Sequence, residues 1–270
     1  MTPEYLLLGH VTRDLLPAGA VAPGGTALYA ALTAYRLGLR SAIVSARADM
    51  PANWPQAIAL AITPSPTPPV FENRYTGGQR HQVIHAAASA LTLADIPRLW
   101  RTAPIIHLGP VLREVPEEFV GAFAGALIGV TPQGWMRAWD TPLPASIRYV
   151  PWRPTPALLQ QIDALVLSVE DVQGDTAIVR AYATHCPLVA LTEGERGATL
   201  FIKGAPHHIP AHPAIERDPT GAGDVFAATL FCRLHSGDTP LRAANVAARV
   251  AAASVGTIGA HGLLALDLGV

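Results

Sequence analysis

The segment from Asp218 to Asp224 (Asp-Pro-Thr-Gly-Ala-Gly-Asp) combines residues that could bind an anion and move a proton. Gly221, Ala222 and Gly223 lead directly into a stretch of helical period. Without bulky side chains, the backbone amides can turn toward one point. The start of a helix adds unpaired N–H groups and a partial positive charge. We therefore expect these three residues to form an anion hole suited to a phosphoryl group.

Asp224 falls in the first turn of the expected helix, beside this anion hole. A carboxylate in that place can accept a proton from an attacking hydroxyl group, as carboxylates do in other phosphoryl-transfer enzymes. The alternative is a plain glycine-rich turn, in which Asp224 only contributes a favourable charge at a helix N-terminus. This segment alone leaves both interpretations open.

The rest of the chain alternates short apolar runs with longer segments of helical period. This alternation predicts an α/β fold: a three-layer α/β/α sandwich with a mostly parallel central sheet. The expected strands are 5–9, 41–45, 105–108, 127–130, 164–167 and 188–191, and the expected helices are 25–37, 117–123, 221–235 and 241–255. Because loops after parallel strands line ligand clefts, Gln133 and Arg137 are candidates to face a substrate.

Two segments predict β-hairpins outside this alternation. Residues 70–85 alternate loosely around Gly77-Gly78 and carry polar residues on both faces, which indicates a small sheet outside the core. Residues 200–209 form the second, around Gly204. The proline-rich stretch 63–69 is expected to be an extended connector. The other proline-rich stretch, 141–156, is expected to be an irregular surface loop.

The composition narrows the functional classes. Net charge is −1 and 14% of the 270 residues are charged, which gives no electrostatic case for binding nucleic acid or an anionic membrane. Cys186 and Cys232 make no disulfide framework and are expected to be reduced, buried thiols. We see no signal peptide and no apolar stretch typical of a membrane span, so we expect a soluble, cytoplasmic protein. The histidines at 207, 208 and 212 lack the pattern of a metal site.

Several motifs, in this order and spacing, resemble the ribokinase-like (PfkB) family of carbohydrate kinases. They cover most of the chain. The motifs are Gly-His-Val-Thr-Arg-Asp at 9–14, Pro-Gly-Gly-Thr-Ala-Leu-Tyr-Ala-Ala from 23 with Arg-Leu-Gly at 36–38, Thr-Glu-Gly-Glu-Arg-Gly at 192–197, Asp-Pro-Thr-Gly-Ala-Gly-Asp at 218–224 and Ala-Asn-Val-Ala-Ala at 244–248.

The resemblance implies one ribokinase-like kinase domain over 1–270, with a small β-lid from about 13–22 and 70–85. It also implies roles for individual residues. Asp14, Gly24 and Gly25 would contact the substrate. Thr192, Gly194, Gly197 and Asn245 would line the nucleotide, and Asp218 and Thr220 fall where family members often hold a monovalent cation such as K⁺. ATP and Mg²⁺ are the implied cofactors, and a homodimer through the lid is one arrangement used in the family.

The sequence departs from the family at three places. The usual Asn-x-x-Glu motif, which orders water around Mg²⁺, is replaced by Ser168 and Asp171; Asp171 or Glu170 could still engage a hydrated Mg²⁺. The usual asparagine of the N-terminal signature is Tyr29, which puts pentose recognition of the ribokinase type in doubt. Residues 49–69 are shorter than usual and lack a Gly-Asp-Asp stretch.

The sequence therefore predicts an ATP-dependent kinase that phosphorylates an alcohol group of a sugar, nucleoside or cyclic polyol. The pattern is somewhat closer to inositol-kinase-like members than to ribokinase. The alternative is a non-catalytic ligand-binding or regulatory protein on the same fold, which the replaced Asn-x-x-Glu motif would favour and the intact Asp224 would not.

Overall fold

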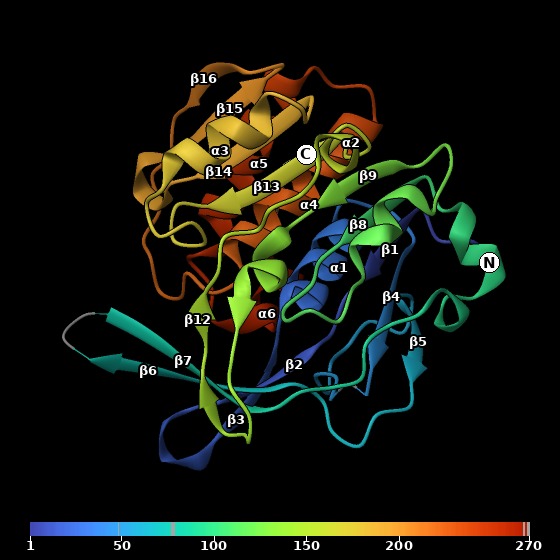
Figure 1. Cartoon of the computed structure of the whole chain (residues 1–270), viewed down its shortest axis with the longest axis vertical. Helices are drawn as coiled ribbons and strands as arrows, with labels where there is room; N and C mark the ends of the chain where they lie inside the picture. Colours follow the sequence, from blue (N-terminus) through green and yellow to red (C-terminus); the bar gives the residue numbers. More distant parts are fainter. Residues whose placement is uncertain (48, 77–78, 267, 269–270) are drawn as a thin grey trace.

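The computed structural model describes residues 1–47, 49–76, 79–266 and 268. A nine-stranded sheet runs through the molecule in the order β16-β15-β14-β13-β9-β8-β1-β4-β5 (Figure 1). Its strands are β1 (Tyr5–Leu8), β4 (Ser41–Ala46), β5 (Ala59–Thr63), β8 (Ile105–Leu108), β9 (Leu127–Val130), β13 (Ala164–Ser168), β14 (Leu188–Thr192), β15 (Ala198–Ile202) and β16 (Ala205–Ile209). All neighbours are parallel except the β14-β15 and β15-β16 pairs, which are antiparallel.

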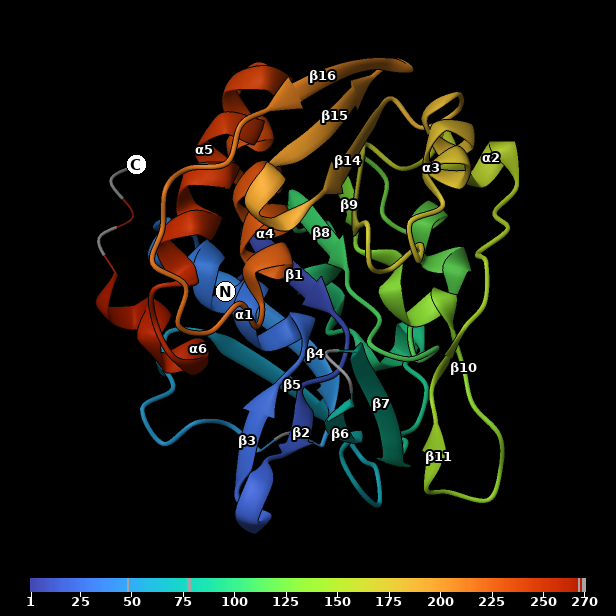
Figure 2. The ribbon, with the colours of Figure 1, turned by 90° about the vertical axis from the view of Figure 1, so that its left-hand side faces the viewer.

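Helices cover both faces of this sheet (Figure 2). One face carries α1 (Thr26–Arg36), α4 (Ala222–His235), α5 (Pro240–Ser254) and α6 (Gly259–Gly262), and the other carries α2 (Pro156–Leu159) and α3 (Thr176–Ala183). Side chains of a strand alternate between the two faces of the sheet. On β1, Leu7 packs into the core beneath α1, α4 and α5, and Leu6 and Leu8 pack into the core beneath α2 and α3. The predicted three-layer α/β/α sandwich is confirmed.

A second sheet of five strands, in the order β11-β7-β6-β2-β3, forms the lid at one end of the molecule (Figure 2). Its strands are β2 (Thr12–Leu15), β3 (Val21–Gly24), β6 (Val70–Thr76), β7 (Gln79–Ala86) and β11 (Ala145–Ser146). The first four agree with the lid expected at about 13–22 and 70–85. The expected glycine turn at Gly77-Gly78 lies outside the described residues.

Some elements differ from the prediction. Residues 117–123 do not form an α-helix: a short 3₁₀-helix, η4 (Glu117–Gly121), lies between Pro116 and Gly125, because proline and glycine limit helix length. The proline-rich stretch 141–156 is not wholly irregular, since it supplies β11 and β12 (Arg148–Tyr149), the latter paired with β10 (Arg137–Ala138). The other 3₁₀-helices are η1 (Pro17–Gly19), η2 (Leu93–Asp95), η3 (Arg98–Thr102), η5 (Pro132–Met136), η6 (Gly194–Arg196) and η7 (Leu263–Ala265).

Two further expectations concern cysteines and membranes. Cys186 and Cys232 are free and buried, as predicted. Among the described residues, no helix has the length and apolar character needed to cross a membrane.

Candidate active site

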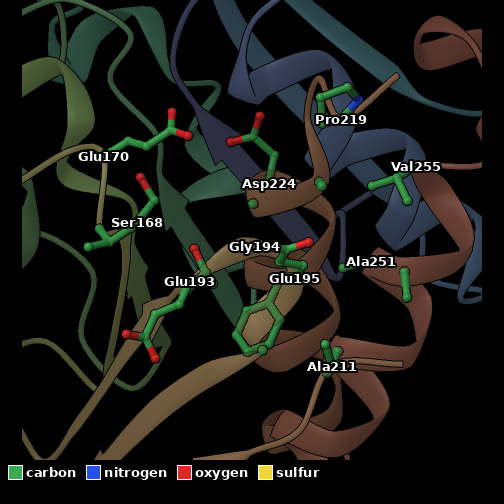
Figure 3. A pocket seen from close by; sticks show the side chains of 18 of the residues that line it. Ser168, Glu170, Glu193, Gly194, Glu195, Ala211, Pro219, Asp224, Ala251 and Val255 are labelled. Atoms are coloured by element: carbon green, nitrogen blue, oxygen red, sulfur yellow. The ribbon is translucent and has the colours of Figure 1, made fainter. Parts of the chain in front are cut away.

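A cavity of about 880 Å³ lies at the carboxyl ends of β9, β13 and β14, against the start of α4. Ligand-binding clefts of open α/β sheets occur at this edge. Figure 3 shows side chains from the loops after β13 and β14 on one side of the cavity and from α4 and α5 on the other. Its size is typical of a small-molecule site.

The anion-hole segment forms the N-terminus of α4. Gly221 is the N-cap and has a left-handed backbone (φ 80°), which favours glycine. A Cβ atom at Gly221 would also lie 2.2 Å from the ring of Tyr29, so α1 packs closely against this turn. Ala222 and Gly223 follow on the cavity wall, and Gly223 has open space around it. The Ala222 amide donates to Pro219 O at 3.2 Å, so the anion hole expected from three amides is reduced to those of Gly221 and Gly223, which lie where a phosphoryl group could enter.

Asp224 lies in the first turn of α4 and lines the same cavity. Loss of hydration raises the pKa of its carboxyl group from 3.8 to about 7; a hydrogen bond from the Thr26 side chain and the charge of Arg137 oppose this rise, and the charge of Asp171 adds to it. A carboxylate with a pKa near neutrality is well matched to general-base catalysis. Asp224 also has a positioned partner, because Thr26 belongs to the first turn of α1 and is buried.

Polar residues at the end of β13 and in the loop that follows it line the wall opposite Asp224. Figure 3 shows the carboxylates of Glu170 and Asp224 directed toward the same space, with Ser168 nearby. Asp171 is more constrained: one oxygen accepts a hydrogen bond from Ser168 N at 2.8 Å, and the other accepts one from Gln133 Nε2 at 2.7 Å. Glu170 is exposed to the cavity. Asp171 therefore fixes the loop, and the Glu170 carboxylate is open to an incoming ligand or ion.

The part of the cavity beyond Asp224 includes three of the four residues expected at the nucleotide. Thr192, Gly194 and Gly197 line it. Asn245 does not: it is exposed, and its side-chain amide donates to Leu241 O on the same helix. The wall from α5 is instead made one to three turns later, by Ala248, Ala251, Ala252 and Val255, and it continues into the loop residues Ala211, His212, Pro213, Ala214 and Glu216.

Four of the five residues expected to contact the substrate lie toward the lid, and the fifth, Gln133, lines the main cavity beside Asp171. The Asp14 carboxylate accepts a hydrogen bond from Thr12 Oγ1 at 2.8 Å and lies against Gly24. Gly25 precedes α1 and has φ 87°. Arg137 donates to Val111 O at 2.5 Å, and its guanidinium carbon lies 5.7 Å from the centre of the Phe71 ring on lid strand β6. Arg137 thus lies between the lid and Asp224.

Asp218 and Thr220 bracket the turn before α4. The Asp218 carboxylate accepts hydrogen bonds from Thr220 N at 3.0 Å and from Gly259 N at 2.9 Å. Burial would raise the pKa of Asp218, but a hydrogen bond from the Thr220 side chain, together with these two backbone bonds, outweighs burial and lowers the pKa. This carboxylate therefore ties the anion-hole turn to the start of α6.

Sequence reasoning missed two threonines in the cavity, Thr26 and Thr131. Thr26 stands directly after the double glycine, and Thr131 directly follows β9; the position of Thr131 after a parallel strand was the available signal. The loop 211–216 and the alanine face of α5 were also missed, because alanines on a helix give no sign of which face borders a ligand.

The C-terminal part of the chain matches a known family. Residues 164–265 match the pfkB family carbohydrate kinase model. The "Bifunctional protein HldE" of Rhodopseudomonas palustris (strain BisA53) is 46% identical over 76 residues, which are 27% of this chain and 16% of that protein. The protein of the same name from Bradyrhizobium diazoefficiens is 47% identical over 76 residues, 27% of this chain and 15% of that protein. The matches thus span about a sixth of the length of these curated relatives.

Solved structures match over nearly the whole chain. A pyrophosphate-dependent kinase in the ribokinase family, complexed with a pyrophosphate analog and myo-inositol, has a TM-score of 0.78 at 19% identity over 97% of this chain and 100% of that chain. Arabidopsis thaliana ribokinase complexed with ribose and ATP has a TM-score of 0.71 at 21% identity over 98% of each chain. At these identities the likeness shows the fold. The predicted resemblance to ribokinase-like (PfkB) carbohydrate kinases is confirmed.

Proposed function

We propose that this chain, which has the ribokinase fold and matches the pfkB family over residues 164–265, transfers the terminal phosphoryl group of ATP to an alcohol group of a sugar, nucleoside or cyclic polyol, inositol included. The observation that carries the proposal is the placement of Asp224, whose pKa is raised to about 7, in the first turn of α4 in a cavity of small-molecule size. A plain structural turn would not need a partly buried carboxylate with a perturbed pKa.

The chemistry assigned to these residues is an in-line displacement. The acceptor oxygen forms a bond to the terminal phosphorus of ATP while the bond from that phosphorus to the bridging oxygen breaks, and ADP leaves with the electron pair. The proton of the acceptor hydroxyl passes to a carboxylate oxygen of Asp224. The amides of Gly221 and Gly223 stabilise the charge on the phosphoryl oxygens during transfer, while the Ala222 amide stays bonded to Pro219 O.

The described residues hold no cluster of three or more His, Cys, Asp or Glu that could bind a metal ion alone, so the proposed Mg²⁺ is a hydrated ion held mainly by the donor phosphates beside the one open carboxylate opposite Asp224. Glu170 presents its carboxylate to the cavity (Figure 3), and oxygen ligands with retained waters are what Mg²⁺ prefers. Asp171 contributes by holding the loop, because both of its oxygens already accept hydrogen bonds. When bound, Mg²⁺ neutralises charge on the donor phosphates. Asp218 and Thr220 remain the proposed place of a monovalent cation, which a comparison of K⁺ and Na⁺ buffers would test.

The walls of the cavity favour a nucleotide over pyrophosphate as donor. Beyond the carboxylates, one wall is apolar and made of the alanine face of α5 with Pro213, which gives a flat base a surface to pack on. The same region carries Glu193, Glu195 and Glu216, and Arg196 is the one arginine or lysine among its described lining residues. A small, highly charged pyrophosphate would gain little from such walls. The proposed nucleotide residues are Thr192, Gly194 and Gly197, with Ala251 and Val255 in place of Asn245.

The acceptor is proposed to bind between the lid and Asp224, with Asp14 accepting hydrogen bonds from its hydroxyl groups at the double glycine Gly24-Gly25. Arg137 and Gln133 stand on the facing loop after β9. Several adjacent hydroxyl groups on one ring would suit this arrangement, since a carboxylate accepts two hydrogen bonds at once.

The decisive experiment is phosphoryl transfer with ATP and, separately, pyrophosphate against ribose, fructose phosphates, nucleosides and inositols. Asp224→Asn serves as the matched control. We expect turnover with ATP and at least one acceptor, lost in the control. Ligand binding without turnover on any acceptor would support the alternative, a non-catalytic binding or regulatory protein. Turnover with pyrophosphate alone would overturn the choice of donor.

A further inference from the structure

A chain of buried polar side chains lies behind the cavity on three neighbouring strands. Tyr5 on β1 places its Oη 2.6 Å from His107 Nδ1 on β8, and His107 Nε2 lies 3.0 Å from Thr131 Oγ1 at the end of β9. Tyr5 and His107 are fully buried. The Phe231 ring packs edge-on against the imidazole at 5.0 Å. Burying polar groups is costly unless they are hydrogen-bonded, and here Tyr5 and Thr131 are each bonded to the imidazole between them.

The direction of each hydrogen bond follows from protonation. Burial lowers the pKa of His107 to about 3 and raises the pKa of Tyr5 well above its ordinary value, so both groups are neutral near pH 7. A neutral imidazole has one N–H donor and one acceptor nitrogen. Within the described part of the chain, the recorded partner of Tyr5 Oη is His107 Nδ1. Tyr5 therefore donates to Nδ1, and the imidazole proton must reside on Nε2.

It follows that His107 Nε2–H donates to Thr131 Oγ1. The hydroxyl oxygen of Thr131 then acts as the acceptor in this bond, and its own proton points elsewhere. Thr131 is 8% exposed and is one of the residues that line the cavity. Since the apolar core lies on the imidazole side, the cavity is where this proton can be donated.

Thr131 lies close to the proposed base. A Cβ atom at Gly109 would be 2.7 Å from Thr26 Cγ2 and 3.5 Å from Thr131 Oγ1, so the two threonines flank Gly109 side by side. Thr26 in turn donates its hydroxyl to Asp224. Strand β9 stands between β13, whose loop carries Glu170, and β8 and β1, which lead to the lid. Thr131 therefore occupies the middle of the site, where donor and acceptor must meet.

We propose that Thr131 donates a hydrogen bond to an oxygen of the phosphoryl group in transfer, and that Tyr5 and His107 act as positioning residues that fix the direction of this donor. The assignment rests on the proposed kinase function. A donor oriented before the substrate arrives stabilises developing charge without reorganisation during the reaction. The Tyr5–His107 pair, which is buried in the sheet, fixes the direction of the Thr131 hydroxyl group. Hydrogen bonds to the second ring nitrogen of metal-bound histidines fix those side chains in the same way.

The first test is kinetic. Thr131→Val removes the hydroxyl at nearly constant shape, and Thr131→Ser is the matched control that keeps it. We expect Thr131→Val to lower kcat by about 10- to 100-fold, as loss of one charge-assisted hydrogen bond does, with KM for the acceptor changed little, and Thr131→Ser to stay close to wild type. A Thr131→Val variant that keeps kcat within about threefold of wild type would overturn the role of Thr131.

The second test needs no substrate. ¹⁵N NMR of the imidazole should show His107 as the Nε2–H tautomer in the wild type, and Tyr5→Phe should weaken that preference and lower kcat less than Thr131→Val does. An Nδ1–H tautomer in the wild type would overturn the relay. An active wild type with an unaffected Thr131→Val would refute this inference alone, whereas a wild type inactive on every acceptor would refute the proposed function and this role with it. Thermal midpoints of all variants separate loss of fold from loss of function.

Discussion

Asp224→Asn separates the two roles open to this residue, because they predict opposite effects on stability as well as different effects on rate. Asparagine keeps the shape and can still accept the hydrogen bond from Thr26, but it accepts no proton near neutral pH. If Asp224 is the general base, kcat should fall by ~10²–10⁴-fold, which corresponds to roughly 3–5 kcal/mol in the barrier. If Asp224 is only a favourable helix charge, the rate should hold and about 0.3–1 kcal/mol of stability should be lost.

The expected effect of Asp224→Asn on stability follows from the pKa of the Asp224 carboxyl group. A carboxyl group whose pKa moves from 3.8 to about 7 on folding carries an upper limit of about 4 kcal/mol, at ~1.36 kcal/mol for each pKa unit. The side chain stays partly open to the cavity, so water reduces this to about 1–2 kcal/mol. The folded state binds the proton more tightly than the unfolded state, so this cost is absent near pH 4, grows between pH 4 and 7 and is complete above pH 7.

The asparagine variant should therefore unfold like the wild type near pH 4 and be more stable by about 1–2 kcal/mol at pH 8. Denaturant unfolding at both pH values measures this difference, and kcat with a turned-over acceptor measures the rate. In the wild type, kcat should rise with pH through a midpoint set by Asp224. A variant that loses stability at pH 8 and keeps kcat within about tenfold would refute both the general base and the raised pKa.

Three other outcomes are expected. Glu170→Ala should raise severalfold the Mg²⁺ concentration needed for half-maximal rate. Asp171→Ala should mainly lower the free energy of unfolding, by about 1–2 kcal/mol, because two partly buried donors, Ser168 N and Gln133 Nε2, lose their acceptor. The reverse pattern would return the Mg²⁺ role to Asp171. Ala251→Trp should raise KM for ATP at least about tenfold, because the indole would occupy space beside the apolar wall of the cavity. The control is Asn245→Ala, on the outer face of the same helix, which should leave KM for ATP unchanged. Finally, β3 is the edge strand of the lid sheet, and Val21 on this strand is 54% exposed. We therefore predict a homodimer through the lid, which Val21→Lys should dissociate. Sedimentation of the wild type as a monomer at micromolar concentration would exclude this dimer.

The parts of the fold that could be predicted are those whose signal is local. Runs such as the one at β1 are apolar throughout because both faces are buried, and buried parallel strands are recognisable for that reason. Strand β5 was missed because its residues are mostly half-exposed at the edge of the sheet. The expected helix at 117–123 failed because apolar periodicity does not distinguish a helix from a short 3₁₀ turn.

Residues of the candidate site could likewise be predicted where the signal is local in the sequence, and could not be predicted where it depends on packing. Gly221 and Asp224 could be placed together because they are close in the sequence and stand at a helix start. Asn245 was expected at the nucleotide, but the phase of α5 turns it away from the cavity, and a helix phase is set by packing rather than by the residue itself. Thr131 could have been named as a cleft residue from its place after β9, but its proposed role depends on hydrogen bonds to His107 and Tyr5, which are far away in the sequence.

The order of strands explains why these distant residues meet. From β1 the chain runs outward to β4 and β5, and it then returns to the other side of β1 and continues through β8, β9, β13 and β14. The loops after β1 and β8 therefore leave in opposite directions, and ligands bind in the crevice that such a reversal opens at the carboxyl ends of the strands. Tyr5 and His107 join the two strands at this point beneath the sheet's edge. Thr26 lies in the same crevice, between Gly109 and Asp224. The position of the Asp224 carboxylate therefore depends on how the chain packs where the strand order reverses. A substitution that disturbs the packing of Thr26 against Gly109 should lower kcat before it destabilises the fold.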